Sequence, residues 1–179
     1  WDSMALLAYL ALLRFRFNTT LPGASCTDFR TVADLPTLMR WRREVIEHVF
    51  GEVPSDALME ANRRYYATHI ADGSHIAVVA HTDGEDAGCG AICLTEELPS
   101  PDNPSGRCAY LMNIYVRQPF RSRGIGRAIV CRLVEKAREA RCDKIYLETT
   151  AAARPLYKRT GFEPLPGIMK YADIQSSES

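Results

Sequence analysis

IYVRQPFRSRGIG, residues 114–126, is an apolar strand pattern followed by a short basic turn that runs directly into the helical pattern RAIVCRLVEKAREA. Gly124 and Gly126 fall in the first turn of this helix, where main-chain N–H groups lack helical partners and the helix dipole is positive. Glycine has no side chain, so it lets an anion approach these donors closely. The stretch therefore predicts a binding site for an anionic group, of which a diphosphate is the obvious example.

The spacing of the glycines excludes the two most common phosphate-binding loops. A P-loop requires G-x-x-x-x-G-K-(S/T), which the sequence lacks, and a dinucleotide fingerprint requires a third glycine where this chain has Ile129. What remains is Arg121-x-x-Gly124-x-Gly126, with further arginines at positions 117, 123 and 127. Taken alone, this segment also fits an ordinary strand-to-helix turn with surface arginines.

A second segment, close to the end of the chain, supports a binding function. The run KIYLETT, residues 144–150, is followed by AAARPLYKRTGF, residues 151–162. Together the two segments resemble the GNAT superfamily of N-acetyltransferases. The first satisfies that family's pyrophosphate-loop pattern (Q/R)-x-x-G-x-(G/A). The second resembles its closing signature A-x-x-L-Y-x-x-x-G-F at Ala153, Leu156, Tyr157, Gly161 and Phe162.

The periodicity of apolar residues predicts the order of the secondary structure. The predicted strands are residues 27–32, 75–81, 87–95, 110–116, 144–149 and a terminal strand around 162–171. The predicted helices are residues 34–50, with Asp34 as N-cap, 55–71, 124–141 and 152–160. This is the element order of the GNAT fold. The resemblance therefore implies an α+β protein with a mixed, mostly antiparallel sheet whose two central parallel strands splay apart.

The chain length of 179 residues predicts one domain. The resemblance implies that this is an N-acetyltransferase domain over residues 25–173, and we expect a flexible tail at 174–179. Residues 1–24 form an apolar extension outside the family resemblance. Its run MALLAYLALL is too short to span a bilayer and lacks the flanks of a secretory signal. A helix covering an apolar patch, a dimer contact and translated sequence upstream of the true start are all open interpretations.

Composition and charge limit the partners. The formal net charge is zero, so there is no global basic field to attract nucleic acid or an anionic membrane. The six cysteines form no CxxC pair or cysteine–histidine cluster, which favours reduced thiols, no metal site and a cytoplasmic location. We therefore expect a small-molecule or peptide partner, and the protein is a candidate homodimer.

The resemblance implies acetyl-coenzyme A (acetyl-CoA) as the acetyl donor, held between the splayed strands. Main-chain groups of one strand would pair with its pantetheine arm, and the N–H groups of the glycine turn would bind its pyrophosphate. One position departs from the family, because many members have an asparagine where this chain has a threonine. The predicted cofactor-binding residues are Ile114, Tyr115, Val116, Arg121, Ser122, Arg123, Gly124, Ile125, Gly126, Arg127 and Thr150.

The resemblance also implies a general acid. Tyr157 matches the family tyrosine whose hydroxyl approaches the coenzyme sulfur; packing of the last helix is the alternative role. Glu148 is the predicted catalytic general base, at the end of a strand flanking the cleft. Other candidate bases are Glu96, Glu97, one of the histidines at 69, 75 and 81, or a chain of water molecules.

We expect the acceptor to bind against the first two helices and the loop at residues 99–107. These helices contain Trp41, Arg42, Arg43, Glu60, Tyr65 and Tyr66, which suit an acidic or aromatic amine or simply form a packed face. On the central strand, Tyr110 and Asn113 are candidates for the cleft lining, and Asn113 equally fits a β-bulge.

The leading hypothesis is an enzyme that acetylates a primary amine of a small molecule or of a protein or peptide. A non-catalytic acetyl-CoA-binding regulatory or interaction module of the same fold is the main alternative. A toxin-like acetyltransferase acting on aminoacyl-tRNA is a third, and the neutral net charge argues against it.

Overall fold

The computed structural model describes residues 24–29 and 31–169 and contains one five-stranded sheet. The strands lie in chain order across the sheet, all antiparallel except for the parallel pair β4 and β5. Their bounds are β1 Ala24–Phe29, β2 His75–Thr82, β3 Glu85–Glu96, β4 Arg107–Val116 and β5 Lys144–Leu147. The mixed, mostly antiparallel sheet predicted from the sequence is confirmed.

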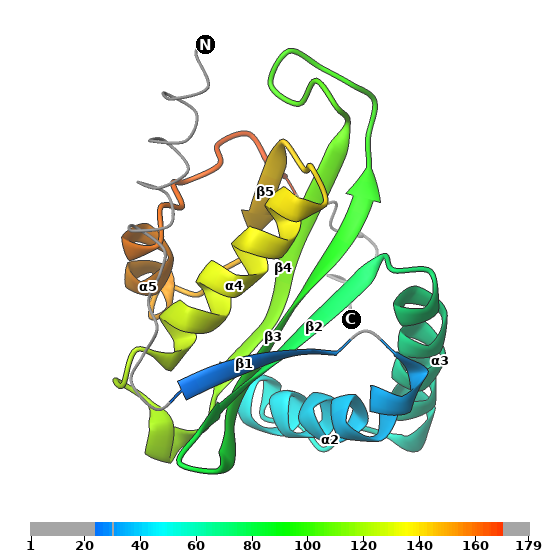
Figure 1. The fold of residues 1–179 in the computed structure, drawn as a ribbon, viewed down its shortest axis with the longest axis vertical. Coiled ribbons are helices and arrows are strands. Elements are labelled where there is room, and N and C mark those ends of the chain that lie inside the picture. The colour runs from blue at the N-terminus through cyan, green and yellow to red at the C-terminus, as the bar shows by residue number, and fades with distance from the viewer. Residues whose placement is uncertain (1–23, 30, 170–179) are drawn as a thin grey trace, which may run out of the picture.

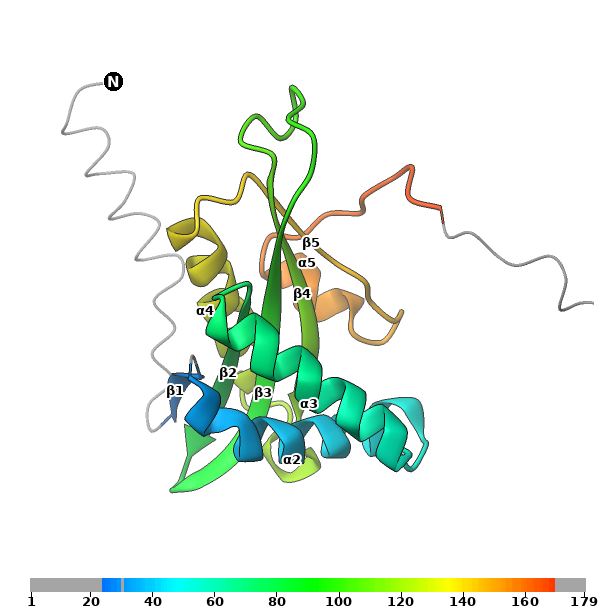
Figure 2. The same cartoon turned by 90° about the vertical axis from the view of Figure 1, so that its right-hand side faces the viewer.

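Helices cover both faces of the sheet (Figures 1 and 2). On one face lie α2, Leu35–Val45, which continues as a π-helical turn over Ile46–Phe50, and α3, Asp56–Ala71. On the other face lie α4, Ile125–Glu139, and the short α5, Arg154–Arg159. Among the described residues, no helix is long and apolar enough to cross a membrane.

Alternating residues of the central strands separate two apolar cores. Val78 and Ala80 of β2 pack in the core under α4, whereas Ala77 and Val79 pack toward α2 and α3. On β3, Gly90 allows α4 to approach closely, because a Cβ there would lie 2.5 Å from Cγ2 of Ile129. The sheet is therefore buried on both faces at its centre.

A β-bulge interrupts the pairing of β3 and β4 opposite Gly90. Cys89 pairs with Tyr115 and Ala91 with Met112, so two residues of β4 oppose one residue of β3. The extra residue is Asn113, which has a left-handed backbone with φ of 57°. The bulge predicted as one interpretation of Asn113 is confirmed, and it turns the Asn113 side chain toward α2 and α3.

The parallel strands β4 and β5 separate after a short ladder. Their last pair is Leu111 with Leu147, where β5 ends, whereas β4 continues to Val116. The β5-facing edge of residues 112–116 therefore has no strand partner within the described part of the chain. An open space between the two strands follows from this difference in length.

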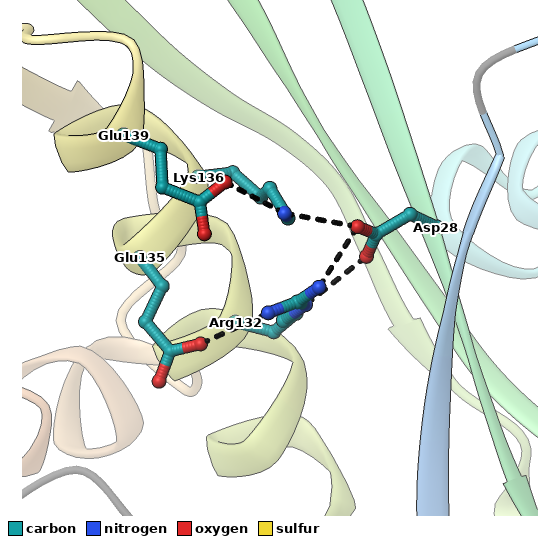
Figure 3. A network of polar contacts seen from close by, with 5 residues as sticks. All are labelled: Asp28, Arg132, Glu135, Lys136 and Glu139. Carbon is teal, nitrogen blue, oxygen red and sulfur yellow. Dashed lines mark hydrogen bonds and ion pairs between the residues drawn. The ribbon is translucent and has the colours of Figure 1, made fainter. Parts of the chain in front are cut away.

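A polar network joins the edge strand β1 to α4 (Figure 3). Arg132 binds both carboxylate oxygens of Asp28, at 3.0 and 2.8 Å, and Lys136 lies 3.1 Å from the same carboxylate. Burial pushes the pKa of Asp28 up, but the hydrogen bonds from Arg132 and Lys136 outweigh it and hold that pKa below its ordinary value. Glu135 and Glu139 complete the network from the helix surface.

One predicted strand is wrong over the described residues. The terminal strand is absent over the described residues 162–169, because Pro164 and Pro166 lack main-chain donors and Gly167 has φ of 89°. Asp34 is the N-cap residue of α2, as predicted, but its side chain makes no capping hydrogen bond and accepts hydrogen bonds from the N–H and hydroxyl of Thr31. Predictions for the N-terminal extension, for the end of the domain and for the tail fall wholly or largely outside the described residues.

Candidate active site

A cavity of about 1570 Å³ opens between β4 and β5 and extends under α2 and α3. A pocket for one small molecule is typically roughly 300–1,000 Å³, so this cavity has room for a large ligand and a second substrate. One end is lined by the turn before α4 and by α5, and the other by α2, α3 and their aromatic side chains.

The turn before α4 presents main-chain donors to the cavity. Ser122 and Gly124 both have left-handed backbones, with φ of 60° and 81°, which fold the chain tightly before the helix. The first main-chain bond of the helix runs from the N–H of Ala128 to the carbonyl of Gly124, at 3.0 Å. The N–H groups of residues 125–127 therefore precede the helical ladder and are available to an anion.

Gly126 is the point where this turn meets α5 and β4. A Cβ at this position would lie 3.4 Å from Cδ2 of Leu156 and 3.7 Å from Cγ2 of Val116. A methyl group here would make ordinary van der Waals contacts with both elements, so the turn packs closely against them. The turn and its donors fit a diphosphate.

The four arginines of this segment have different roles. Arg121 and Arg127 line the cavity, and Arg121 also donates from Nε to the carbonyl of Val116 at 2.9 Å. Arg123 instead pairs with Asp83 at 2.7 Å and does not line the cavity. Arg117 binds Glu44 through two hydrogen bonds, at 2.7 and 2.6 Å, and lies over the Trp41 ring.

The unpaired edge of β4 forms one wall of the cavity. Ile114, Tyr115 and Val116 all line it, beyond the last residue paired with β5. The Tyr115 ring packs edge-on against Trp41, with ring centroids 6.3 Å apart. The main chain of this segment is therefore available for pairing with an extended, amide-containing ligand.

Tyr157 lies on α5 and lines the cavity next to this edge. It is 8% exposed and packs edge-on against Phe162, with ring centroids 6.0 Å apart. Burial raises the pKa of its hydroxyl above the ordinary value. The hydroxyl is therefore protonated at neutral pH and has a proton to donate.

Glu148 follows the end of β5, is exposed and lines the same cavity. Burial raises the pKa of Tyr110, and the nearby Glu148 charge raises it further. Thr150 also lines the cavity, and its hydroxyl accepts a hydrogen bond from the N–H of Ala153 at 3.3 Å. Glu97 points elsewhere, toward Lys144 at 3.0 Å, and Glu96 does not line the cavity.

The structure places only part of the predicted acceptor region of the two helices at the cavity. Arg42, Tyr65 and Tyr66 line the cavity. Three other residues do not: Trp41 is buried in the core, Arg43 is exposed outside the cavity, and Glu60 binds Arg63.

The expectation that the loop at residues 99–107 builds the acceptor site is wrong. This loop folds on itself at the far end of β3 and β4, where the Asn103 amide donates to Glu97 at 2.9 Å. None of its residues lines the cavity. The long β3–β4 ladder, which pairs as far as Glu96 and Arg107, places the loop away from the cavity.

Only one of the three histidines considered from the sequence reaches the cavity. His75 lines it, whereas His81 pairs with Asp86 at 2.7 Å and His69 contacts Ser74 at 2.8 Å. Burial lowers the pKa of His75 to about 4, so its imidazole is neutral near pH 7.

Several lining residues were missed in the sequence. Asn62 lies four residues before Tyr66, and this spacing, which places both on one face of α3, was an available signal. His48, Val49 and Phe50 line the cavity from the π-helical turn. Because a π-helical turn shifts the faces of a helix, no simple periodicity indicates their position.

The comparisons with known proteins agree with this geometry. Residues 36–162 match the model of the acetyltransferase (GNAT) family. A probable glucosamine 6-phosphate N-acetyltransferase 2 of Oryza sativa subsp. japonica is 39% identical over 57 residues, which cover 32% of this chain and 34% of the rice protein. The match thus spans about a third of that curated relative.

Solved structures share the fold over most of the chain. A predicted acetyltransferase from Clostridium acetobutylicum, crystallised with acetyl-CoA, superposes with a TM-score of 0.74 at 23% identity, covering 87% of this chain and 99% of its own. A GCN5-related N-acetyltransferase from Ralstonia eutropha JMP134 superposes with a TM-score of 0.69 at 27% identity, covering 84% and 99%. The family model covers well over half of the sequence, and the chain belongs to the acetyltransferase (GNAT) family.

Proposed function

We propose that this protein transfers an acetyl group from acetyl-CoA to a primary amine of a small molecule or peptide. One observation carries the proposal: a single cavity contains the glycine turn before α4, the unpaired edge of β4 and the protonated hydroxyl of Tyr157. In this proposal the turn binds an anion, the strand edge pairs with an extended ligand, and the hydroxyl serves as an acid, all within the same cavity. Family membership and the acetyl-CoA in the Clostridium structure support acetyl-CoA as the ligand.

In this proposal the cofactor lies along the wall formed by β4 and α4. The N–H groups of residues 125–127 bind the pyrophosphate, and the guanidinium groups of Arg121 and Arg127 add charge-assisted hydrogen bonds. The main chain of residues 114–116 pairs with the pantetheine arm as an added strand would. Thr150 lies beside the arm in place of the asparagine common in the family.

Acetyl-CoA supplies an activated thioester, whose carbonyl carbon forms a new bond with the amine nitrogen while the carbon–sulfur bond breaks. The Tyr157 hydroxyl donates its proton to the departing sulfur, because burial keeps that hydroxyl protonated at neutral pH. The Glu148 carboxylate accepts the proton that the amine loses, directly or through water. The proton count balances, and no redox step is involved.

The amine enters from the end of the cavity lined by α2 and α3. Its aromatic and polar side chains suit a small molecule better than an extended polymer, and the rice relative is named for a small amino sugar phosphate. We therefore place small amines ahead of peptides as acceptors.

Two measurements test the proposal. Acetyl-CoA is expected to raise the melting temperature of the protein. Pantetheine, which lacks the pyrophosphate, is expected to raise it much less. A panel of amines, including glucosamine 6-phosphate, free amino acids and short peptides, is then assayed by release of free coenzyme A thiol. Binding of acetyl-CoA without thiol release above the hydrolytic background for any amine would contradict transfer and support the non-catalytic alternative.

A further inference from the structure

The guanidinium of Arg42 is held in the cavity wall by two neutral amides. Its Nε donates to Oδ1 of Asn62 on α3 at 2.8 Å, and its Nη1 donates to Oδ1 of Asn113 at the β4 bulge at 2.6 Å. Asn113 in turn donates from its amide nitrogen to the hydroxyl of Tyr66 at 3.2 Å. Three elements therefore fix the position of Arg42 without neutralising its charge.

Among the described residues, no carboxylate forms an ion pair with Arg42. A guanidinium has five N–H donors, and two of them are used on the amides, so three remain for a ligand. Glu148 is the single acidic residue of the described chain that lines the cavity, and it lies at the end of β5 rather than on this wall.

The neighbouring titratable side chains do not compensate this charge at neutral pH. Burial raises the pKa of Tyr66 to about 12, so its hydroxyl is not ionised. Burial lowers the pKa of His75 to about 4, so its ring is neutral. Burial likewise raises the pKa of Tyr65. Arg42 is therefore a fixed cation on a wall of neutral aromatic and amide groups.

We infer that Arg42 binds an anionic group of the acceptor, which makes the acceptor a primary amine that carries a carboxylate or a phosphate. This inference rests on the proposed function and narrows its substrate class. The planar guanidinium and its remaining donors suit bidentate recognition of either anion. An amine without an anionic group leaves these donors unused.

The experiment compares matched pairs of amines with and without an anion. One pair is glucosamine 6-phosphate and glucosamine, and the other is L-phenylalanine and L-phenylalaninamide. In the wild-type protein, kcat/KM for at least one anionic member should exceed that for its neutral partner by roughly 10- to 100-fold, the range for a hydrogen bond to a charged group. The pair that shows the preference identifies the anion.

The Arg42→Gln variant should abolish this preference, because it keeps a polar side chain and removes the charge. The two amines of a pair also differ in basicity. This difference affects the ratio of their kcat/KM values equally in the wild type and the variant, so it cancels when the two ratios are compared. Arg40→Gln is the matched control, since Arg40 is exposed on the same helix and does not line the cavity. A preference for the anionic amine that survives in Arg42→Gln, or that is absent in the wild type, overturns the inference.

Binding measurements separate this inference from the proposed function. Calorimetric titration of the same amines into the coenzyme A complex gives affinities without turnover. If anionic amines bind in an Arg42-dependent manner and no thiol is released, the inference stands and acetyl transfer does not. If neutral and anionic amines react equally, transfer stands and the inference fails. A purely structural role of Arg42 would lower the melting temperature and the affinity for every amine alike, which also overturns the inference.

Discussion

The cationic side chains on α4 and the cationic side chain on α2 have opposite kinds of partner. Arg132 and Lys136 share the carboxylate of Asp28 and have Glu135 and Glu139 beside them (Figure 3). Arg42, on the other face of the sheet, donates side-chain hydrogen bonds only to neutral amide oxygens among the described residues. Positive charge that is neutralised within the protein ties elements together, whereas positive charge that is positioned but not neutralised is available to a ligand.

This comparison predicts that substitutions in the cavity alter activity at nearly constant stability. Substitutions in the network around Asp28 should alter stability at nearly constant activity.

The largest effect is expected for Tyr157→Phe. Losing the acid should lower kcat at least roughly 100-fold, the lower end of the contribution of general acid catalysis. The dissociation constant for acetyl-CoA and the melting temperature should change little, because the ring and its contact with Phe162 are kept. Unchanged turnover would remove Tyr157 from the mechanism.

Asp28→Asn should produce the reverse pattern. It leaves the nearly buried Lys136, whose side chain is 8% exposed, without its inner carboxylate. We expect a loss of about 2 kcal/mol in unfolding free energy, less than the ~3–5 kcal/mol of a fully buried pair because Glu135 and Glu139 remain. Urea denaturation measures this loss, and KM for acetyl-CoA should not change. Glu135→Gln, at a 44% exposed carboxylate, is the control and should cost less than about 1 kcal/mol.

The neutral imidazole of His75 should make stability depend on pH. Its folded-state pKa of about 4 lies below the ordinary 6.5, so between these values the unfolded chain binds a proton that the folded protein does not. Stability is therefore full above pH 6.5 and falls as the pH decreases, by about 2 kcal/mol between pH 7 and 5 for this group.

Urea denaturation of wild type and His75→Gln at both pH values checks this dependence. The variant should lose about 2 kcal/mol less than the wild type over the same interval. His48→Gln is the control, because His48 is exposed and is not among the causes of the His75 shift, and it should follow the wild type. Equal losses in wild type and His75→Gln would show that other groups account for the acid sensitivity.

The smallest expected effect is that of alanine substitutions at two glycines. These substitutions distinguish backbone strain from the loss of a ligand contact. Gly124→Ala and Gly73→Ala each place a side chain on a left-handed backbone, with φ of 81° and 78°, and each should cost about 1 kcal/mol of stability. Only Gly124 lies in the turn that lines the cavity. Calorimetry should therefore show weaker acetyl-CoA binding for Gly124→Ala alone. Equal affinity in the two variants would place the pyrophosphate elsewhere.

The sequence predicted the parts of the site that depend on local spacing. The turn before α4 and the position of Tyr157 on α5 each arise within about a dozen consecutive residues, so their motifs describe their geometry directly. The sheet was also predictable, because its strands follow one another in chain order. The predicted terminal strand was wrong where two prolines interrupt the apolar pattern.

The loop at residues 99–107 shows where local reasoning fails. Its polar, proline-rich composition indicates a loop but not its direction, which depends on how far β3 and β4 remain paired. Arg123 likewise belongs to the basic turn in sequence, yet Asp83 from the β2–β3 hairpin takes its guanidinium. Neither the length of the β3–β4 ladder nor the distant partner of Arg123 is encoded by spacing within the segment itself.

The sequence by itself determined that this chain has a GNAT fold, a glycine turn at the start of a helix and a tyrosine at the end of the same core. Only the tertiary structure decided which charges remain available. Arg42, Asn62 and Asn113 come from three elements separated by up to 71 residues, and they meet because the β4 bulge turns Asn113 toward α2 and α3. The side chains that pack against a charged group decide whether its charge is neutralised. Because these side chains come from distant elements, only the folded chain brings them together.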